Sequence, residues 1–189
     1  MTGMKIYIKN MVCIRCQMAV KYELEKLGLH HTRVELGETE IMEDLSAELR
    51  DNLSNSLKNI GLELIDDKKT ILVEKVKTTI IELIYSSDNQ IKTNLSDYLR
   101  EKLNHNYTSI SNLFSEVKGT TIEKFYVTQK VERVKELLVY DKLNLTDIAF
   151  KLNYSSVAHL SNQFKKITGL TPSHFKNLRI NKSIARKSQ

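Results

Sequence analysis

A 32-residue stretch that occurs twice, 50 positions apart, decides the fold of the C-terminal part of this 189-residue chain. Residues 94–125 read NLSDYLREKLNHNYTSISNLFSEVKGTTIEKF, and residues 144–175 read NLTDIAFKLNYSSVAHLSNQFKKITGLTPSHF. Both copies begin with Asn-Leu-Ser/Thr-Asp, carry Ser-Asn-x-Phe in the middle, and continue with Gly-x-Thr and a final Phe. Repetition at a fixed period is typical of a supersecondary unit that is used twice.

Each copy predicts a helix-turn-helix. Asn94 and Asn144 suit a helix N-cap, and the Asp three residues later lies near the positive end of the helix dipole. A short helix, a polar turn and a second helix follow, and Gly119 or Gly169 ends the second helix in a left-handed conformation. The second helix is expected to expose small polar residues and to bury three apolar ones, which are Ile110, Phe114 and Val117 in the first copy and Leu160, Phe164 and Ile167 in the second. The two second helices and the helix that joins the copies are expected over residues 107–118, 156–168 and 122–139.

The first 66 residues show alternating strand and helix patterns instead. Strands are expected over residues 5–9, 32–36, 39–41 and 62–65, and helices over residues 18–27 and 45–60. The order βαββαβ predicts two helices on one face of a four-stranded antiparallel sheet. The fold class is therefore α+β, with an N-terminal ferredoxin-like domain and a C-terminal all-α domain that contains two helix-turn-helix units.

The distribution of charge supports this division. We expect a domain over residues 1–66, a linker over residues 67–70, a helical domain over residues 71–180 and a basic tail over residues 181–189. The chain carries 29 Lys and Arg against 23 Asp and Glu, yet residues 1–70 have a net charge of −2 and residues 71–189 a net charge of +8. A basic C-terminal half favours contact with a polyanion, although the same charge also fits ordinary solvated surface.

Composition excludes several classes of protein. Hydrophobic residues make up 41% of the chain, which is enough for packed cores. No apolar run approaches the roughly 18 residues of a membrane span, and the N-terminus lacks the apolar region of an export signal, so we expect a cytoplasmic protein without membrane contact. His105, His159 and His174 have no Ser, Cys or acidic partner at the spacing of a catalytic motif, and no enzyme activity is predicted.

The helical half resembles the DNA-binding domain of the arabinose-regulator (AraC) family of transcription factors, over about residues 73–180. The stretches that carry the resemblance are KVERVKELL at 130–138, LTDIA at 145–149 and SNQFKKITGLTPSHF at 161–175. The resemblance implies two helix-turn-helix units on one joining helix, with recognition helices in successive major grooves of double-stranded DNA, about one duplex turn apart. RNA polymerase is the further partner that it suggests.

The family's functional positions transfer to residues of this chain. The base-facing positions would be Thr108, Ser111, Asn112, Val157, Ala158, Ser161 and Asn162. The phosphate-facing positions would be Lys118, Lys130, Arg133, Lys165 and Lys166. Asn bonds adenine and small apolar groups meet thymine methyls, so an A·T-leaning site is expected. Two features depart from the family pattern. The family commonly has Arg where Asn112 and Asn162 stand, and it has basic residues where Ser115 and Glu116 follow Phe114, so the second helix-turn-helix is expected to contribute most of the DNA binding. Both Asn residues would also fit an ordinary polar surface.

The two cysteines of the chain, Cys13 and Cys16, follow Met11 in a Met-x-Cys-x-x-Cys motif. Thiolates at a strand-to-helix turn converge on one ion, and soft thiolates favour Cu(I) or Zn. Residues 4–66 resemble the heavy-metal-associated domain of copper chaperones and metal-pumping ATPases, which implies a metal site at both cysteines and a buried Met11. Leu62 replaces the aromatic residue often found beside that site, and Arg15 adds a positive charge, so the identity of the metal stays open.

These features together predict a sequence-specific transcription regulator that is controlled by a soft metal ion, with Cu(I) favoured over Zn. A copper chaperone or another metal donor would be its further partner. Three alternatives remain: a redox-sensing or constitutive regulator of the same type without metal, a metallochaperone, and a thiol oxidoreductase.

Overall fold

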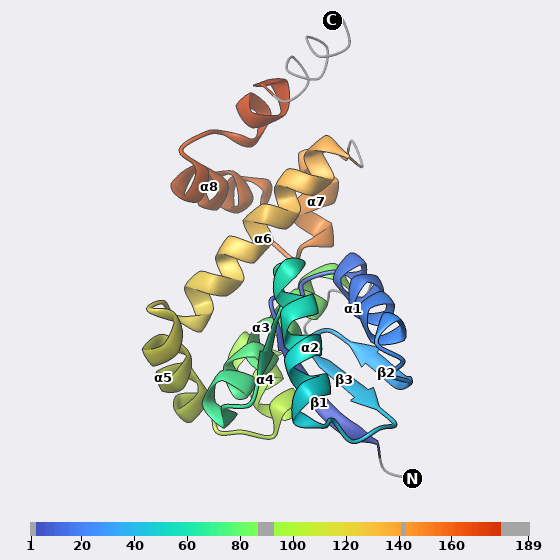
Figure 1. Ribbon diagram of the computed structural model, residues 1–189. Helices are drawn as coiled ribbons and strands as arrows, with labels where there is room; N and C mark the ends of the chain where they lie inside the picture. Colours follow the sequence, from blue (N-terminus) through green and yellow to red (C-terminus); the bar gives the residue numbers. More distant parts are fainter. Residues whose placement is uncertain (1–2, 87–92, 141–142, 179–189) are drawn as a thin grey trace, which may run out of the picture. The chain divides into compact units, whose positions relative to one another are not determined.

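The computed structural model describes residues 3–86, 93–140 and 143–178 (Figure 1). The chain divides into two compact units, the first made of Met1–Thr79 and Leu99–Val117 and the second of Ile80–Tyr98 and Lys118–Gln189. The elements in chain order are β1 (Met4–Lys9), α1 (Ile14–Lys26), β2 (His31–Glu35), β3 (Glu38–Ile41), α2 (Ala47–Asn59), β4 (Glu63–Ile65), α3 (Lys68–Tyr85), α4 (Leu95–Leu103), α5 (Tyr107–Lys118), α6 (Ile122–Val139), α7 (Leu145–Lys151) and α8 (Val157–Thr168). None of the described helices is both long and apolar enough to cross a bilayer. The basic tail expected over residues 181–189 lies outside the described residues.

The first unit contains a four-stranded antiparallel sheet with the strand order β2-β3-β1-β4. The central strand β1 pairs with β3, where Ile6 lies opposite Thr39, and with β4, where Ile8 lies opposite Leu64. The predicted order of strands and helices and the antiparallel sheet are confirmed.

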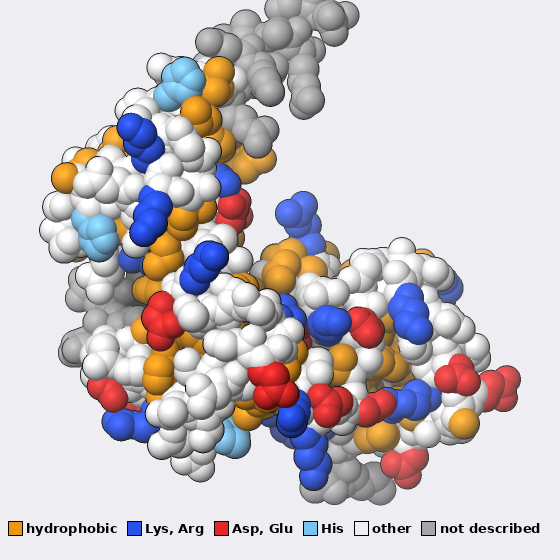
Figure 2. Space-filling view, turned by 90° about the vertical axis from the view of Figure 1, so that its left-hand side faces the viewer, with side chains coloured by type: hydrophobic (Ala, Val, Ile, Leu, Met, Phe, Trp, Pro, Cys, Tyr) orange, Lys and Arg blue, Asp and Glu red, His pale blue; other side chains and the backbone are white. Residues whose placement is uncertain are grey.

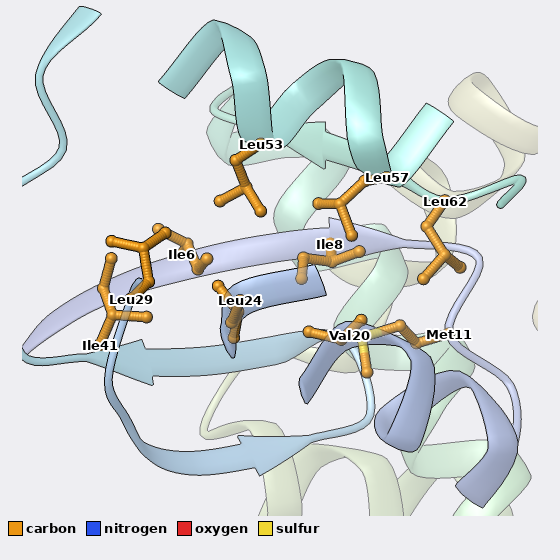
Figure 3. Packing of buried hydrophobic residues seen from close by; sticks show 10 residues of the cluster. All are labelled: Ile6, Ile8, Met11, Val20, Leu24, Leu29, Ile41, Leu53, Leu57 and Leu62. Carbon is orange, nitrogen blue, oxygen red and sulfur yellow. The ribbon is translucent and has the colours of Figure 1, made fainter. Parts of the chain in front are cut away.

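One face of this sheet packs against α1 and α2. Because successive side chains of a strand point to opposite faces, Ile6 and Ile8 of β1 share the face that meets the helices. Figure 3 shows the core that results, made of Ile6, Ile8, Met11, Val20, Leu24, Leu29, Ile41, Leu53, Leu57 and Leu62. Met11 is 2% exposed and belongs to the core, as predicted, so its sulfur is not available as a surface ligand.

Thr39 lies in the same core and has an unsatisfied hydroxyl. The residue is 0% exposed, and among the described residues its Oγ1 has no hydrogen-bond partner. A buried polar atom without a partner costs about 1–3 kcal/mol. We expect Thr39→Val, which keeps the side-chain shape, to raise the free energy of unfolding by about 1 kcal/mol in a denaturant titration. Thr32→Val is the matched control, because exposed Thr32 donates to the Glu40 carbonyl at 3.4 Å, and a loss of stability in Thr39→Val alone would contradict the expectation.

The expected linker is partly helical. Residues 68–70 form the first turn of α3, because the Asp67 carboxylate accepts hydrogen bonds of 2.8 Å from both the backbone N–H and the hydroxyl of Thr70. These bonds hold the pKa of Asp67 below its ordinary value. Within the first unit, Lys75 of α3 lies 4.9 Å from the centroid of the Tyr7 ring and forms a 3.2 Å ion pair with Glu38. This helix therefore covers the sheet face to which Tyr7 points, opposite the face of Ile6 and Ile8.

The two repeat copies begin with the predicted helix caps. The Asn94 side-chain oxygen accepts from the backbone N–H of Asp97 at 2.9 Å, and the Asn144 oxygen accepts from Asp147 at the same distance. Both α5 and α6 have the predicted bounds, and α8 begins one residue later than predicted, at Val157. Local capping chemistry thus sets the helix boundaries.

Left-handed residues mark the same two places in each copy. Gly119 and Gly169 have φ values of 64° and 76°, as predicted for the ends of the second helices. Asn104 and Asn153, in the turns between the helices, have φ values of 52° and 50°. Asn tolerates this conformation better than other residues with a side chain, so the repeat extends to the geometry of the turn.

Candidate nucleic-acid interface and thiol pair

Helix α5 of the first unit has one buried side and one exposed side. Ile110 and Phe114 are 1% and 0% exposed and hold the helix on its unit. Of the predicted base-facing residues on this helix, Thr108 and Asn112 are exposed and Ser111 is half-buried. Polar groups that can bond base edges therefore remain accessible on α5.

Helix α8 of the second unit repeats this arrangement. Leu160 and Phe164 are both 0% exposed, and the Phe164 ring meets the Phe175 ring edge-on at a centroid distance of 5.6 Å. Its predicted base-facing residues are exposed at Ala158 and Asn162 and half-buried at Val157 and Ser161. The two helices thus present chemically similar polar positions, each within its own unit.

The last turns of α5 and α8 differ from the prediction in one respect. Val117 and Ile167 were expected to be buried but are 39% and 37% exposed. Each follows a buried Phe by three residues, and at about 100° per residue this places it some 60° away from the buried line of the helix. The apolar pattern of each helix therefore extends one turn beyond its core contact.

Helix α8 is more basic in its last turn than α5. Lys165 and Lys166 lie exposed in the last turn of α8, and the upper part of Figure 2, where α8 faces the viewer, shows Lys and Arg side chains. In α5 the corresponding turn carries Glu116, which pairs with Lys69 of the same unit at 3.3 Å, and half-buried Lys118. Of the predicted phosphate-facing residues, Lys165 and Lys166 of α8 are therefore more accessible than Lys118 of α5.

Two predicted phosphate-facing residues have other surroundings in the second unit. Lys130 is 7% exposed, and its Nζ lies 3.8 Å from the centroid of the Tyr154 ring, so its burial argues against contact with phosphate. Arg133 donates from Nη1 to Glu136 at 2.8 Å and lies 4.6 Å from the centroid of the Tyr85 ring. The resemblance assigned both residues to phosphates, whereas their contacts with Tyr154 and Tyr85 depend on residues that lie far away in the sequence.

The two thiols lie together at the start of α1. Cys13 is the N-cap residue and Cys16 lies in the first turn, with their Sγ atoms 3.5 Å apart and both side chains half-buried. Burial acts to raise the pKa of the Cys13 thiol, but hydrogen bonds from Cys16 and Arg15 outweigh it and leave this pKa below its ordinary value. No third His, Cys, Asp or Glu joins the pair within the part of the chain that the structure describes. A soft ion held by thiolates at about 2.3 Å fits two sulfurs at this separation.

The lowered pKa of Cys13 predicts a reactive thiol. The thiolate is the nucleophile, so alkylation of Cys13 is expected to reach half its maximal rate at a lower pH than for an unperturbed cysteine. The measurement is the pH profile of iodoacetamide labelling in Cys16→Ala and Cys13→Ala proteins, followed by mass spectrometry. Because hydrogen bonds from Cys16 lower the pKa of Cys13, the midpoint of Cys13 labelling should fall at a lower pH in wild type than in Cys16→Ala. A wild-type profile at or above the ordinary value would contradict this prediction.

Comparisons with known proteins agree with the geometry of the helical part. Residues 99–178 match the model of a helix-turn-helix domain. An uncharacterized HTH-type transcriptional regulator of Staphylococcus aureus is 32% identical over 96 residues, which are 51% of this chain and 12% of that protein. The uncharacterized HTH-type transcriptional regulator YtdP of Bacillus subtilis is 24% identical over 146 residues, which are 75% of this chain and 19% of that protein. This chain therefore spans a fifth or less of the length of these relatives.

A solved structure shows the same fold. The C-terminal domain of AraT, a response regulator from Geobacillus stearothermophilus, superposes with a TM-score of 0.52 at 21% sequence identity and covers 60% of this chain and 89% of that domain. At this identity the likeness concerns the fold. Together with the matched domain model and the repeated helix pairs, it shows that the C-terminal region of this chain contains a helix-turn-helix domain.

Proposed function

We propose that this chain is a transcription regulator of the AraC type that binds double-stranded DNA with α5 and α8. The observation that carries the proposal is the two-sided character of both helices. Asn112 and Asn162 remain exposed while Phe114 and Phe164, two residues further along, are fully buried. A helix anchored on one side and polar on the other is the form that enters a major groove.

The exposed groups also indicate what the helices read. An Asn side chain bonds N6 and N7 of adenine together, and the apolar side chains of Val157 and Ala158 suit thymine methyl groups. Lys165 and Lys166 would contact phosphates, which adds affinity without sequence information. We therefore propose a site rich in A·T pairs, with the contacts of α8 stronger than those of α5.

Selection from a randomised duplex pool tests this function. We expect enrichment of A·T-rich half-sites about one duplex turn apart, bound roughly 1,000-fold or more tightly than a shuffled duplex. Failure to enrich any sequence would overturn the proposal. Enrichment of G·C-rich half-sites would retain DNA binding but refute the assignment of the Asn residues to adenine.

For control of DNA binding we propose the thiol pair as the effector site, with Cu(I) as the favoured ion and Zn second. The support is the 3.5 Å separation of the sulfurs and the lowered pKa of Cys13, which suits deprotonated soft ligands. When bound, the ion would supply a cross-link between Cys13 and Cys16 at the start of α1. An effector acts only if it interacts differently with two states of the protein, so DNA affinity must differ between the loaded and unloaded chain.

A titration of oxygen-free protein separates the alternatives. We expect Cu(I) to bind one ion per chain and to change affinity for the selected duplex, and neither effect to occur in a Cys13→Ser/Cys16→Ser variant. A disulfide detected by mass spectrometry, with the same change in affinity on oxidation, would favour a redox sensor. Identical DNA binding in all states would leave a constitutive regulator, and transfer of copper to a second protein without specific DNA binding would favour a metallochaperone.

A further inference from the structure

Lys130 of the joining helix α6 is a buried cation without an anionic partner. It is 7% exposed, and among the described residues no carboxylate forms an ion pair with it. Its Nζ lies 3.8 Å from the centroid of the Tyr154 ring and 5.5 Å from the centroid of the Tyr126 ring. A cation over two aromatic faces, withdrawn from water, is held by attraction to the ring electrons.

Tyr154 connects this cation to the recognition helix. Tyr154 lies in the turn just before α8 and is 8% exposed. The Tyr154 hydroxyl donates to the Gln163 side-chain oxygen at 2.9 Å, and the edge of its ring system meets His159 at a centroid distance of 5.5 Å. Both Gln163 and His159 belong to α8, so one aromatic ring joins α6 to the helix that carries Asn162.

We propose that Lys130 is a positioning residue for DNA recognition: its ammonium group holds Tyr154, and Tyr154 in turn fixes α8 on α6. The inference rests on the proposed function, because it explains how α8 is held for contact with a duplex. It assigns Lys130 an effect on affinity without contact to the phosphates. The neighbouring lysines of α8, which are exposed, are assigned the phosphate contacts instead.

Salt dependence separates positioning from phosphate contact. Each phosphate contact contributes about 0.9 to the slope of log K against log salt concentration. We expect Lys130→Met to bind the selected duplex about 3- to 30-fold more weakly with an unchanged salt slope, because the cation–π contact is lost while the number of contacted phosphates is unchanged. Lys165→Gln is the matched control, in which the slope falls by about 0.9.

The pH profile provides a second readout. Burial lowers the pKa of Lys130 to about 8, whereas burial raises the pKa values of the facing Tyr126 and Tyr154 hydroxyls, which stay neutral in this range. On α8, His159 contacts Tyr154 at a ring-centroid distance of 5.5 Å, and the lysines Lys165 and Lys166 are exposed in the last turn. Affinity of the wild type should therefore fall as pH rises through about 8, and Lys130→Arg, which keeps its charge, should retain affinity over the same range.

The free energy of unfolding should change with pH in the opposite direction to the DNA affinity. The unfolded state keeps Lys130 protonated up to its ordinary pKa near 10.5, while the folded state releases the proton near 8. Between these values the unfolded state binds more protons, so the contribution of Lys130 to stability rises with pH. A fall in DNA affinity over this range is therefore not explained by loss of the fold.

The experiment measures binding of wild type, Lys130→Met, Lys130→Arg and Lys165→Gln to the selected duplex by fluorescence anisotropy, from 50 to 300 mM salt and from pH 7 to 9, with circular dichroism as a check of folding. An unchanged slope in Lys130→Met together with the alkaline loss in wild type but not in Lys130→Arg supports the inference. If Lys130→Met shows a salt slope reduced as in Lys165→Gln, or binds as tightly as wild type, the inference about Lys130 is overturned. Specific binding by the wild type would still support the proposed function in that case. If Lys130→Met does not fold, equal pH profiles of wild type and Lys130→Arg overturn the inference about Lys130. A wild type without DNA binding overturns both.

Discussion

Phe164→Ala is expected to destabilise the second unit by about 3–5 kcal/mol and to abolish specific DNA binding. The Phe164 side chain is fully buried and packs edge-on against Phe175, so its removal loses both the transfer free energy and the contacts around the cavity that is left. A loss of this size is a large part of the stability of an ordinary domain. Denaturant unfolding followed by circular dichroism measures it.

The neighbouring Lys165→Ala is the control for this prediction. Lys165 is exposed on the same helix, and its replacement should change the free energy of unfolding by less than about 0.5 kcal/mol. Phe114→Ala, the same change in the other repeat copy, should resemble Phe164→Ala, because Phe114 is also 0% exposed. A cost below about 1 kcal/mol for both Phe variants would show that the two side chains do not anchor the recognition helices.

Asn162→Ala is expected to weaken binding to the selected duplex by roughly 5- to 150-fold, because a good bidentate contact to a base discriminates by about 1–3 kcal/mol. Binding to a shuffled duplex should stay the same, since an exposed Asn makes no essential contact within the fold. Competition titrations with the two duplexes measure the ratio of affinities.

Asn112→Ala tests whether the two helix-turn-helix copies contribute differently to DNA binding. We expect a smaller effect than for Asn162→Ala, because Ser115 and Glu116 follow Phe114 where Lys165 and Lys166 follow Phe164. Equal losses in both variants would show that the two helices contribute equally. Loss of binding to the shuffled duplex as well would assign the Asn side chains to general affinity and not to base recognition.

Local chemistry is the part of the structure that could be predicted from the sequence. The caps at Asn94 and Asn144 and the left-handed glycines fixed the helix boundaries, because both act through the few residues beside them. The buried positions Phe114 and Phe164 followed from the repeat, since a residue that occupies the same place in two copies serves the same core.

Burial that depends on distant parts of the chain could not be predicted in this way. Lys130 had the charge of a surface residue, and its burial depends on Tyr154, which lies 24 positions away and reaches it only when α6 and the turn before α8 are packed together. The only local signal was Tyr126, four residues before Lys130 and therefore on the same side of the helix. The first turn of α3 differs from the prediction for a local reason: the charged residues 66–69 resemble a linker, but the Asp67 carboxylate caps the helix by accepting from Thr70.

Cleavage of DNA by reagents tethered to α5 and α8 tests whether both helices lie against the duplex. A Cys13→Ser/Cys16→Ser background removes both native thiols, and Thr108→Cys and Ala158→Cys then place a single DNA-cleaving reagent on the exposed side of either helix. We expect cuts within one half-site from residue 108 and within the other from residue 158, about 10 base pairs apart, and none from a control Asn59→Cys. Absence of cleavage from both helices on a duplex that the protein still binds would contradict this expectation.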